Sequence, residues 1–162
     1  MKYILEDILS DFEFHDAKLT FDTFQNDCLK VNCNYLNIHK NSVQNPFDTD
    51  MEIDTAQITF EGFKVISYEV GRGWQVDENG ARYTNDPQII LYDSEATYRF
   101  LEQLKYGTVI LDFDIKDIKE EQKIYFIDAI ANDPFFTVCF TFDRIIITWD
   151  NYKKESWYEK RD

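Results

Sequence analysis

The stretch that decides the fold is residues 136–149, Phe-Thr-Val-Cys-Phe-Thr-Phe-Asp-Arg-Ile-Ile-Ile-Thr-Trp. Apolar side chains alternate with other residues on both sides of Asp143-Arg144, a pair that suits a turn. Such alternation predicts half-buried strands, because successive side chains of a strand point to opposite faces of its sheet. The stretch therefore predicts two antiparallel strands joined by a tight turn.

The same alternation recurs along most of the chain. Asn79-Gly80, between two short alternating runs, is the strongest hairpin signal, because a type I′ turn needs positive φ at both central residues. The segment from Lys116 to Ala131 is ambiguous between strand and helix, and its β-branched and aromatic residues favour the strand. Further strands are predicted at 14–24, 29–35, 56–60, 63–70, 74–76, 81–83, 88–92 and 109–115.

Two segments have helical periodicity. A short amphipathic helix is predicted at the N-terminus, where apolar residues recur at the spacing of one helix face, at Ile4, Leu5, Ile8, Leu9 and Phe12. A central helix is predicted from a cap at Asp93 or Ser94 to Gly107. Its inward face is predicted to hold Tyr98, Phe100, Leu101 and Leu104.

These elements predict an α+β fold, a mostly antiparallel, twisted β-meander with a short N-terminal helix and one central helix. A doubly wound parallel sheet is excluded, because it needs a helix between most of its strands. The chain has 162 residues with no internal repeat and no linker, so we expect a single domain over residues 1–162.

The charge of the chain narrows its partners. It has 17 lysines and arginines against 31 aspartates and glutamates, which gives a net charge of −14. A field of this sign repels nucleic-acid phosphates and anionic lipids, and it attracts cations. We therefore expect a basic protein partner, with no nucleic acid and no membrane as partners. The oligomeric state does not follow from the sequence.

Targeting signals, apolar stretches and cysteines indicate the cellular compartment. The N-terminal residues have no signal-peptide pattern, and no stretch approaches the roughly 18 uninterrupted apolar residues of a membrane span. We expect a cytoplasmic protein. The cysteines, Cys28, Cys33 and Cys139, are odd in number, and the first two are expected on opposite faces of one strand, so no disulfide is expected.

The most distinctive local pattern is a row of four carboxylates at every second residue, Asp48, Asp50, Glu52 and Asp54. In an extended segment they share one face at spacings of about 7 Å. They either stay solvated along an edge or bind something positive, and we assign them to a basic partner. An EF-hand calcium loop needs glycine and glutamate where this chain has isoleucine and threonine. No metal and no cofactor are therefore expected.

A candidate pocket is expected near His15, Asp16 and Tyr35. His15 beside Asp16 has the elements of a general base, but no nucleophile motif or set of metal ligands accompanies them. Hydrogen bonds to the backbone at the start of a strand are the commoner explanation. Asp112 and Asp114 could form an acid pair as in glycosidases, although the polar face of a strand produces the same spacing. No catalytic residue is assigned, and enzymatic activity is not favoured.

Large aromatic residues gather near the C-terminus, including Trp149, Tyr152, Trp157 and Tyr158. They either close the core or form a partly exposed recognition patch, because tryptophan and tyrosine are enriched where binding energy is concentrated. We assign Trp157 and Tyr158 to partner binding, together with the four carboxylates.

Short motifs at the two ends carry a resemblance: Phe14-His15-Asp16-Ala17, Trp149-Asp150-Asn151-Tyr152 and Trp157-Tyr158-Glu159. They resemble segments of small uncharacterised bacterial proteins of β-rich fold, some of which are similar to the immunity proteins encoded beside polymorphic toxins. The resemblance implies a non-enzymatic protein that binds a toxin domain and occludes its active site.

The function favoured by the sequence is a non-enzymatic protein-binding module, an immunity-like inhibitor of a basic bacterial toxin or enzyme. An acidic inhibitor can imitate a phosphate substrate, and electrostatic steering speeds its association. The alternative is a small enzyme or ligand-binding domain with a pocket near His15 and Asp16. A homo-oligomeric structural protein with open sheet edges is a third hypothesis.

Overall fold

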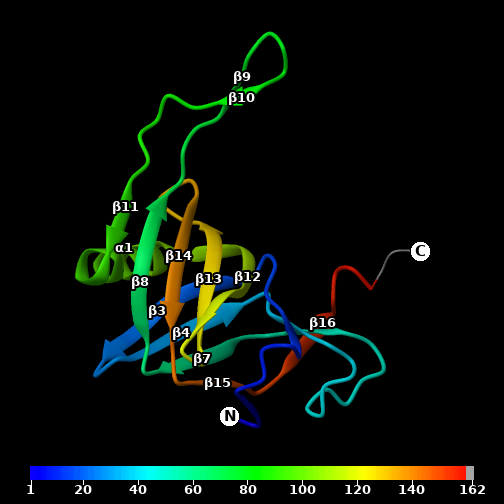
Figure 1. Cartoon of the computed structure of the whole chain (residues 1–162). Helices are drawn as coiled ribbons and strands as arrows, with labels where there is room; N and C mark the ends of the chain where they lie inside the picture. The colour runs from blue at the N-terminus through cyan, green and yellow to red at the C-terminus, as the bar shows by residue number, and fades with distance from the viewer. Residues whose placement is uncertain (160–162) are drawn as a thin grey trace.

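The computed structural model describes residues 1–159, and in this part of the chain ten strands form one antiparallel sheet (Figure 1). In the order in which they lie side by side, these are β1 (Tyr3–Glu6), β15 (Arg144–Trp149), β7 (Ala56–Glu61), β4 (Cys28–Asn34), β3 (Lys18–Gln25), β12 (Thr108–Lys119), β13 (Gln122–Ile130), β14 (Phe136–Thr141), β8 (Lys64–Val70) and β11 (Ile90–Tyr92). The predicted antiparallel, β-rich architecture is confirmed.

The sheet has a narrow seam between β3 and β12. Among the described residues, these strands pair through Thr108 with Leu19 and Val109 with Lys18. Figure 1 shows β3, β4 and β7 crossing β8 and β14 at a steep angle. The two halves pack on each other through aromatic rings, with the centroids of Phe60 and Phe140 6.0 Å apart. The sheet therefore folds back on itself, as in orthogonal packings.

Two smaller sheets complete the strand set of residues 1–159. One has the order β16 (Tyr152–Glu155), β6 (Met51–Ile53), β5 (Asn37–Ile38) and β2 (Phe12–Glu13). The other is a ribbon of β9 (Gln75–Val76) and β10 (Arg82–Tyr83), which projects beyond the end of the large sheet (Figure 1).

The central helix is present as α1 (Asp93–Tyr106), and it packs mainly against β8 and β3. Ala96, Phe100 and Leu104 are buried, whereas Tyr98 is 69% exposed, so its predicted inward position is wrong. The amide of Gly107 donates to the carbonyl of Leu104 and ends the helix as expected. No side chain caps the start, contrary to the predicted cap. In residues 1–159 no helix is both long and apolar enough to cross a membrane.

Helix α1 is fixed to the sheet by a carboxylate in the turn after β13. Asp133 accepts hydrogen bonds from Nε and Nη2 of Arg99, at 2.9 and 2.7 Å, and from the hydroxyl of Tyr68, at 2.5 Å. Burial raises the pKa of Asp133, but the hydrogen bonds from Arg99 and Tyr68 outweigh burial and lower it. The carboxylate of Asp133 thus joins the turn, helix α1 and β8 through its hydrogen bonds with Arg99 and Tyr68.

The N-terminal helix predicted from the sequence is wrong. The segment forms β1 and β2, and β1 pairs with the outer edge of β15, where Leu5 lies opposite Ile147. Leu5 is buried, while Ile4 and Ile8 are 47% and 39% exposed. Asp7 has φ of 56° and cannot continue a helix. Backbone hydrogen bonding to an otherwise open strand edge outweighs the helical spacing of so short a segment.

The ambiguous segment from Lys116 to Ala131 is extended, as favoured, and forms the hairpin of β12 and β13. The Asn79-Gly80 hairpin is also present, but the predicted turn type is wrong. Among these two residues Gly80 alone has positive φ, and the Asp77 carboxylate accepts the amides of Asn79 and Ala81 at 2.9 and 2.8 Å. Hydrogen bonds to the Asp77 side chain therefore stabilise this turn, whereas a type I′ turn would need positive φ at both central residues.

Phe140 is the test of the packing between the two halves of the sheet. It is fully buried and its ring contacts Phe60, Phe63 and Phe142. We expect Phe140→Ala to lower the free energy of unfolding by about 3–5 kcal/mol, because it leaves a cavity where the halves meet. Chemical denaturation measures this change. The control Ile118→Ala, at a side chain that is 59% exposed, should stay within about 0.5 kcal/mol, and an equal loss in both variants would contradict the assignment.

Candidate functional site

A cleft of about 970 Å³ lies where four segments of the chain meet. Its lining comes from residues 7–15, from β12 and the start of β13, and from the turn between β14 and β15. This volume is at the top of the range of about 300–1,000 Å³ typical of ligand sites. The lining residues that carry the chemistry belong to two sets, a row of aromatic rings and a ring of carboxylates.

The aromatic rings form a continuous row along the cleft. The ring centroids of Phe14 and Phe113 are 4.9 Å apart, those of Phe113 and Tyr125 6.1 Å, and those of Tyr125 and Phe142 4.5 Å. Phe14 and Tyr125 are buried, whereas Phe113 and Phe142 are half-buried. The row belongs to the hydrophobic core on one side and to the cleft on the other. It offers a rigid apolar surface at the cleft.

Carboxylates dominate the polar lining. Among the described residues that line the cleft, six are acidic, namely Asp7, Glu13, Asp112, Asp114, Glu121 and Asp143, against one lysine, Lys123. Within residues 1–159 none of the six forms an ion pair with a lysine or arginine. Burial and then the negative charge of Asp7 raise the pKa of Tyr125. The cleft thus holds six carboxylates against one lysine, and none of the six lies within ion-pair distance of a lysine or arginine of residues 1–159.

Three of these carboxylates accept a hydrogen bond from a backbone amide, among them Asp114, whose Oδ1 accepts the amide of Ile115 at 2.7 Å. Asp7 Oδ1 accepts the amide of Ile145 at 2.9 Å, and Glu13 Oε1 accepts the amide of His15 at 2.8 Å. Each carboxylate therefore has a fixed direction while its second oxygen can accept further hydrogen bonds. Fixed carboxylates bind a cation with less loss of side-chain entropy than free ones.

His15 lines the cleft, as expected for the candidate pocket. Its Nδ1 lies 2.7 Å from the carbonyl oxygen of Leu111, which can only accept, so Nδ1 carries the proton. Its Nε2 lies 3.7 Å from Asp16 Oδ1. The Leu111 carbonyl raises the pKa of His15, with smaller contributions of the same sign from Asp16, Glu13 and Asp112.

The other residues of the candidate pocket lie outside the cleft lining. Asp16 is next to His15, with φ of 68° and an exposed side chain. Tyr35 is 51% exposed in the link between β4 and β5, and Lys153 Nζ lies 5.3 Å from its ring centroid. The structure therefore brings His15 and Asp16 together and leaves Tyr35 elsewhere.

The predicted row of four carboxylates does not form one exposed face. Asp48 and Asp54 are exposed, but Asp50 and Glu52 are 8% and 4% exposed. Glu52 lies between two lysines, 3.2 Å from Lys153 Nζ and 3.4 Å from Lys154 Nζ. Glu52 belongs to β6, which lies between β5 and β16 in the small sheet, and all three residues of β6 are buried. The role of these acids in partner binding stays a prediction.

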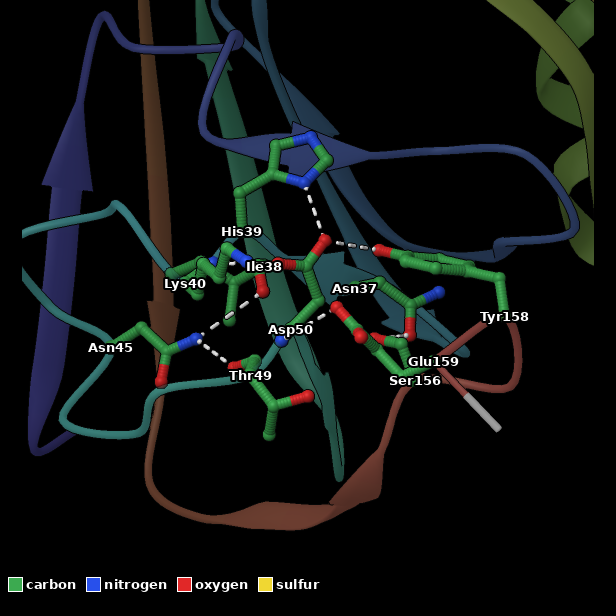
Figure 2. A network of polar contacts seen from close by, with 10 residues as sticks. All are labelled: Asn37, Ile38, His39, Lys40, Asn45, Thr49, Asp50, Ser156, Tyr158 and Glu159. Carbon is green, nitrogen blue, oxygen red and sulfur yellow. Dashed lines mark hydrogen bonds and ion pairs between the residues drawn. The ribbon is translucent and has the colours of Figure 1, made fainter. Parts of the chain in front are cut away.

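Asp50 is the centre of a network that holds the C-terminal segment (Figure 2). Its carboxylate accepts hydrogen bonds from His39 Nδ1 at 2.8 Å, the Lys40 amide at 2.8 Å and the Tyr158 hydroxyl at 2.9 Å. The buried Ser156 donates to Asn37 Oδ1 at 2.8 Å. Burial raises the pKa of Asp50, but these three hydrogen bonds outweigh burial and lower it.

The two aromatic residues assigned to partner binding have different environments. The hydroxyl of Tyr158 is used inside the network, and burial raises the pKa of this residue to about 12. Trp157 is 47% exposed and its ring lies edge-on to that of Tyr158, with centroids 5.5 Å apart. Tyr158 therefore packs against the small sheet, whereas Trp157 lies partly at the surface.

Most of the cleft lining cannot be predicted from local sequence patterns. Asp112 and Asp114 are close in sequence and can be recognised as a pair, whereas Asp7, Glu121 and Asp143 come from separate segments. Their convergence depends on the fold-back of the sheet, which no local pattern encodes. Within residues 1–159 no group of three or more histidine, cysteine, aspartate or glutamate side chains could hold a metal ion, and the three cysteines are free thiols.

Comparisons with known proteins add no relative. No protein-family model matches the chain, and it matches neither a curated protein nor a solved structure.

The network around Asp50 makes stability depend on pH. Because the pKa of Asp50 is lower in the folded than in the unfolded chain, its contribution is complete above about pH 4. That contribution is lost as the pH falls through the folded-state pKa. We expect Asp50→Asn to lower the free energy of unfolding by about 1–3 kcal/mol at neutral pH.

Denaturation curves at a series of pH values measure this effect. The difference between the wild type and Asp50→Asn should shrink towards acid pH. The control Asp48→Asn changes an exposed neighbour and should stay within about 0.5 kcal/mol of the wild type at every pH. A pH-independent difference for Asp50→Asn would contradict the prediction.

Proposed function

We propose that the protein is a non-enzymatic binding module whose acidic cleft captures a basic segment of a partner protein. The observation that carries the proposal is the set of six cleft carboxylates without an ion pair to a lysine or arginine in residues 1–159, above a row of aromatic rings. An arginine or lysine side chain matches both features, because its charged end pairs with carboxylates and its aliphatic stem packs on apolar surface.

The aromatic row adds to this match. A guanidinium or ammonium group is attracted to the face of an aromatic ring, by about 0.5–2 kcal/mol depending on desolvation. Phe113 and Phe142 are half-buried and line the cleft, so they can offer such faces. The net charge of −14 steers a basic protein towards the molecule from any direction. The net charge thus favours the encounter with a basic protein, and the cleft is the site where its cationic side chains bind.

A binding module of this kind is what an immunity-like inhibitor of a basic bacterial toxin or enzyme requires. The inhibitor must bind a cationic surface fast, and electrostatic complementarity raises association rates. The short terminal motifs that resemble immunity proteins support the same conclusion. Asp48, Asp54 and Trp157 lie at the surface, where a whole partner protein that extends beyond the cleft would meet them and a short peptide in the cleft would not.

A small cationic ligand is the second candidate, because the position of His15 in a cleft of about 970 Å³ suits a ligand-binding domain. We favour a peptide segment, since the carboxylates are distributed over four chain segments and the cleft is at the upper limit of small-ligand sites. A polyamine that binds as tightly as a basic peptide would favour the small ligand instead.

Removal of two cleft charges tests the proposed function. We expect an oligoarginine peptide to bind the wild type, and Asp112→Asn/Asp114→Asn to raise its Kd roughly tenfold through lost charge complementarity. Calorimetric titration at several salt concentrations measures both, and wild-type affinity should fall with added salt.

The matched control is Asp48→Asn/Asp54→Asn, which removes the same charge from exposed positions outside the cleft. It should leave the Kd within about twofold, since long-range charge is screened beyond about 10 Å. Equal losses in the two double variants would show non-specific attraction. A loss confined to Asp48→Asn/Asp54→Asn would move the partner surface to the predicted acidic row.

The raised pKa of His15 gives the binding a pH dependence. A protonated His15 adds positive charge to the cleft, so the affinity for oligoarginine should rise as the pH increases through the pKa of His15, which lies above the usual value of about 6.5. One charge at close range in a solvated cleft corresponds to about a threefold change in Kd. Titrations between about pH 5 and about pH 8 cover the transition.

His15→Gln should remove this dependence. His39→Gln, at the other histidine of the chain and outside the cleft, should keep it. A pH dependence that persists in His15→Gln would assign the titration to another group.

A further inference from the structure

Strand β12 has an open backbone edge inside the acidic cleft. One edge of β12 pairs with β13 along almost its whole length. On the other side, within the described residues, β3 pairs only with Thr108 and Val109, and backbone hydrogen bonds with the turn before β3 extend this contact to Ile110. Residues 111–115 then line the cleft with no strand of the described chain beside them on that side. An unpaired strand edge is a template for the addition of another strand.

A turn at Asp16 leaves this edge open. Asp16 has φ of 68°, and the amide of Ala17 donates to the carbonyl of Phe14 at 2.9 Å. In the register of β3 and β12, the residues before Asp16 would lie beside residues 111–115 if the strand continued without this turn. They instead lead back to β2, which pairs with β5 in the small sheet. The cleft therefore lies where a neighbouring strand of β12 would lie.

The part of the edge inside the cleft is regular. The pairing of β12 with β13 shifts register between Ile110 and Asp112 and again between Ile115 and Asp117, with no shift from Asp112 to Ile115. Bulges bend a strand and disrupt its ladder. The stretch from Asp112 to Ile115 is therefore the part of the edge that can pair regularly with another strand. All of it lines the cleft, whereas residues 116–119 do not.

Two amides of β12 are bonded to side chains of the same strand. The amide of Ile115 donates to Asp114 Oδ1 at 2.7 Å, and the amide of Ile118 donates to Asp117 Oδ1 at 2.8 Å. Amides bonded in this way face the open edge, because amides on the side of β13 belong to the ladder. Inside the cleft, a carbonyl of an incoming strand can accept the Ile115 amide, which releases the Asp114 carboxylate for a cationic side chain of the same segment.

The two faces of the open stretch differ in chemistry. Asp112 and Asp114 are exposed on one face, about 7 Å apart along a strand. On the other face, Phe113 belongs to the aromatic row and Ile115 is 40% exposed. Asp112 also lies opposite Asp128 of β13, and like charges directly opposite each other destabilise a sheet. Basic side chains on one face and apolar side chains on the other therefore complement β12 in an added strand.

We propose that the cleft binds its basic partner by strand addition: an extended segment in which basic and apolar residues alternate pairs with the open edge of β12 at residues 112–115. The inference rests on the proposed function, because it uses the same cleft and the same charge complementarity. It adds the conformation and the residue pattern of the partner segment. A helix does not match this edge, because its backbone donors and acceptors are used within the helix.

Peptides of equal composition and charge test the pattern by calorimetric titration. We expect capped Arg-Val-Arg-Val-Arg-Val to bind the wild type roughly tenfold more tightly than capped Arg-Arg-Arg-Val-Val-Val, because only the first places all its arginines on one face of a strand. N-methylation of alternate amides of the first peptide should raise the Kd roughly tenfold for the set that faces β12 and less than about threefold for the other set.

Proline variants test the edge on the side of the protein. Ile115→Pro removes an edge amide inside the cleft, and Ile118→Pro removes the equivalent amide outside it. Proline is tolerated where the missing N–H would face an open edge. We expect the Kd of the alternating peptide to rise roughly tenfold in Ile115→Pro and to stay within about twofold in Ile118→Pro. Ile115→Ala, which keeps the amide, should stay within about threefold and so separates the hydrogen bond from the side chain.

Hydrogen exchange on the wild type needs no variant. The bound alternating peptide should slow exchange of the Phe113 and Ile115 amides and leave that of Ile118 unchanged. Equal affinities of the two arginine peptides, without protection of Phe113 and Ile115, overturn strand addition and leave the proposed function standing. A capped Gln-Val-Gln-Val-Gln-Val peptide that binds as tightly as the alternating arginine peptide overturns the proposed function instead, because positive charge then contributes nothing to binding.

Discussion

The packing of Phe60 against Phe140 is the contact on which the rest of the structure depends. To bring β7 and β14 face to face, the sheet bends back at the seam between β3 and β12, where pairing stops after Val109. Beyond the seam, backbone hydrogen bonds join Ile110 to Asp16 and Ala17. The side chain of His15 then contacts the carbonyl oxygen of Leu111. The outer half of β12 is then free of β3, and residues 111–115 line the cleft. The bend at the seam between β3 and β12 therefore produces both the packing of the core and the cleft.

The negative charges of the molecule fall into two classes with different physical roles. Asp50, Glu52 and Asp133 are buried and surrounded by donors from distant segments. A buried charge is tolerated only with such partners, so these acids fix the fold. The cleft carboxylates lie near aromatic rings, and none of them forms an ion pair with a lysine or arginine of residues 1–159, which leaves their field available for binding. Net charge alone could not distinguish the two classes, because each carboxylate counts as one negative charge in either class.

The features that could be predicted from the sequence are those that depend on the spacing of apolar residues within a short stretch of chain. Alternation at 109–115 and 136–149 identified strands correctly, since their core-facing residues repeat with the period of a strand. The spacing of Ile4, Leu5 and Ile8 suited a helix, but the open edge of β15 offered more hydrogen bonds than a short helix would keep. The cleft could be anticipated only at His15, because its other polar residues meet through long-range topology. The acidic row was visible as a pattern, yet the burial of Asp50 and Glu52 depends on β5 and β16, far apart in sequence.

The composition of the cleft suits a cationic ligand. Among the described lining residues, the polar groups are mostly carboxylates of one sign, and the single histidine is held by the Leu111 carbonyl on one side and faces Asp16 on the other. Such a set stabilises positive charge that is already present on a ligand.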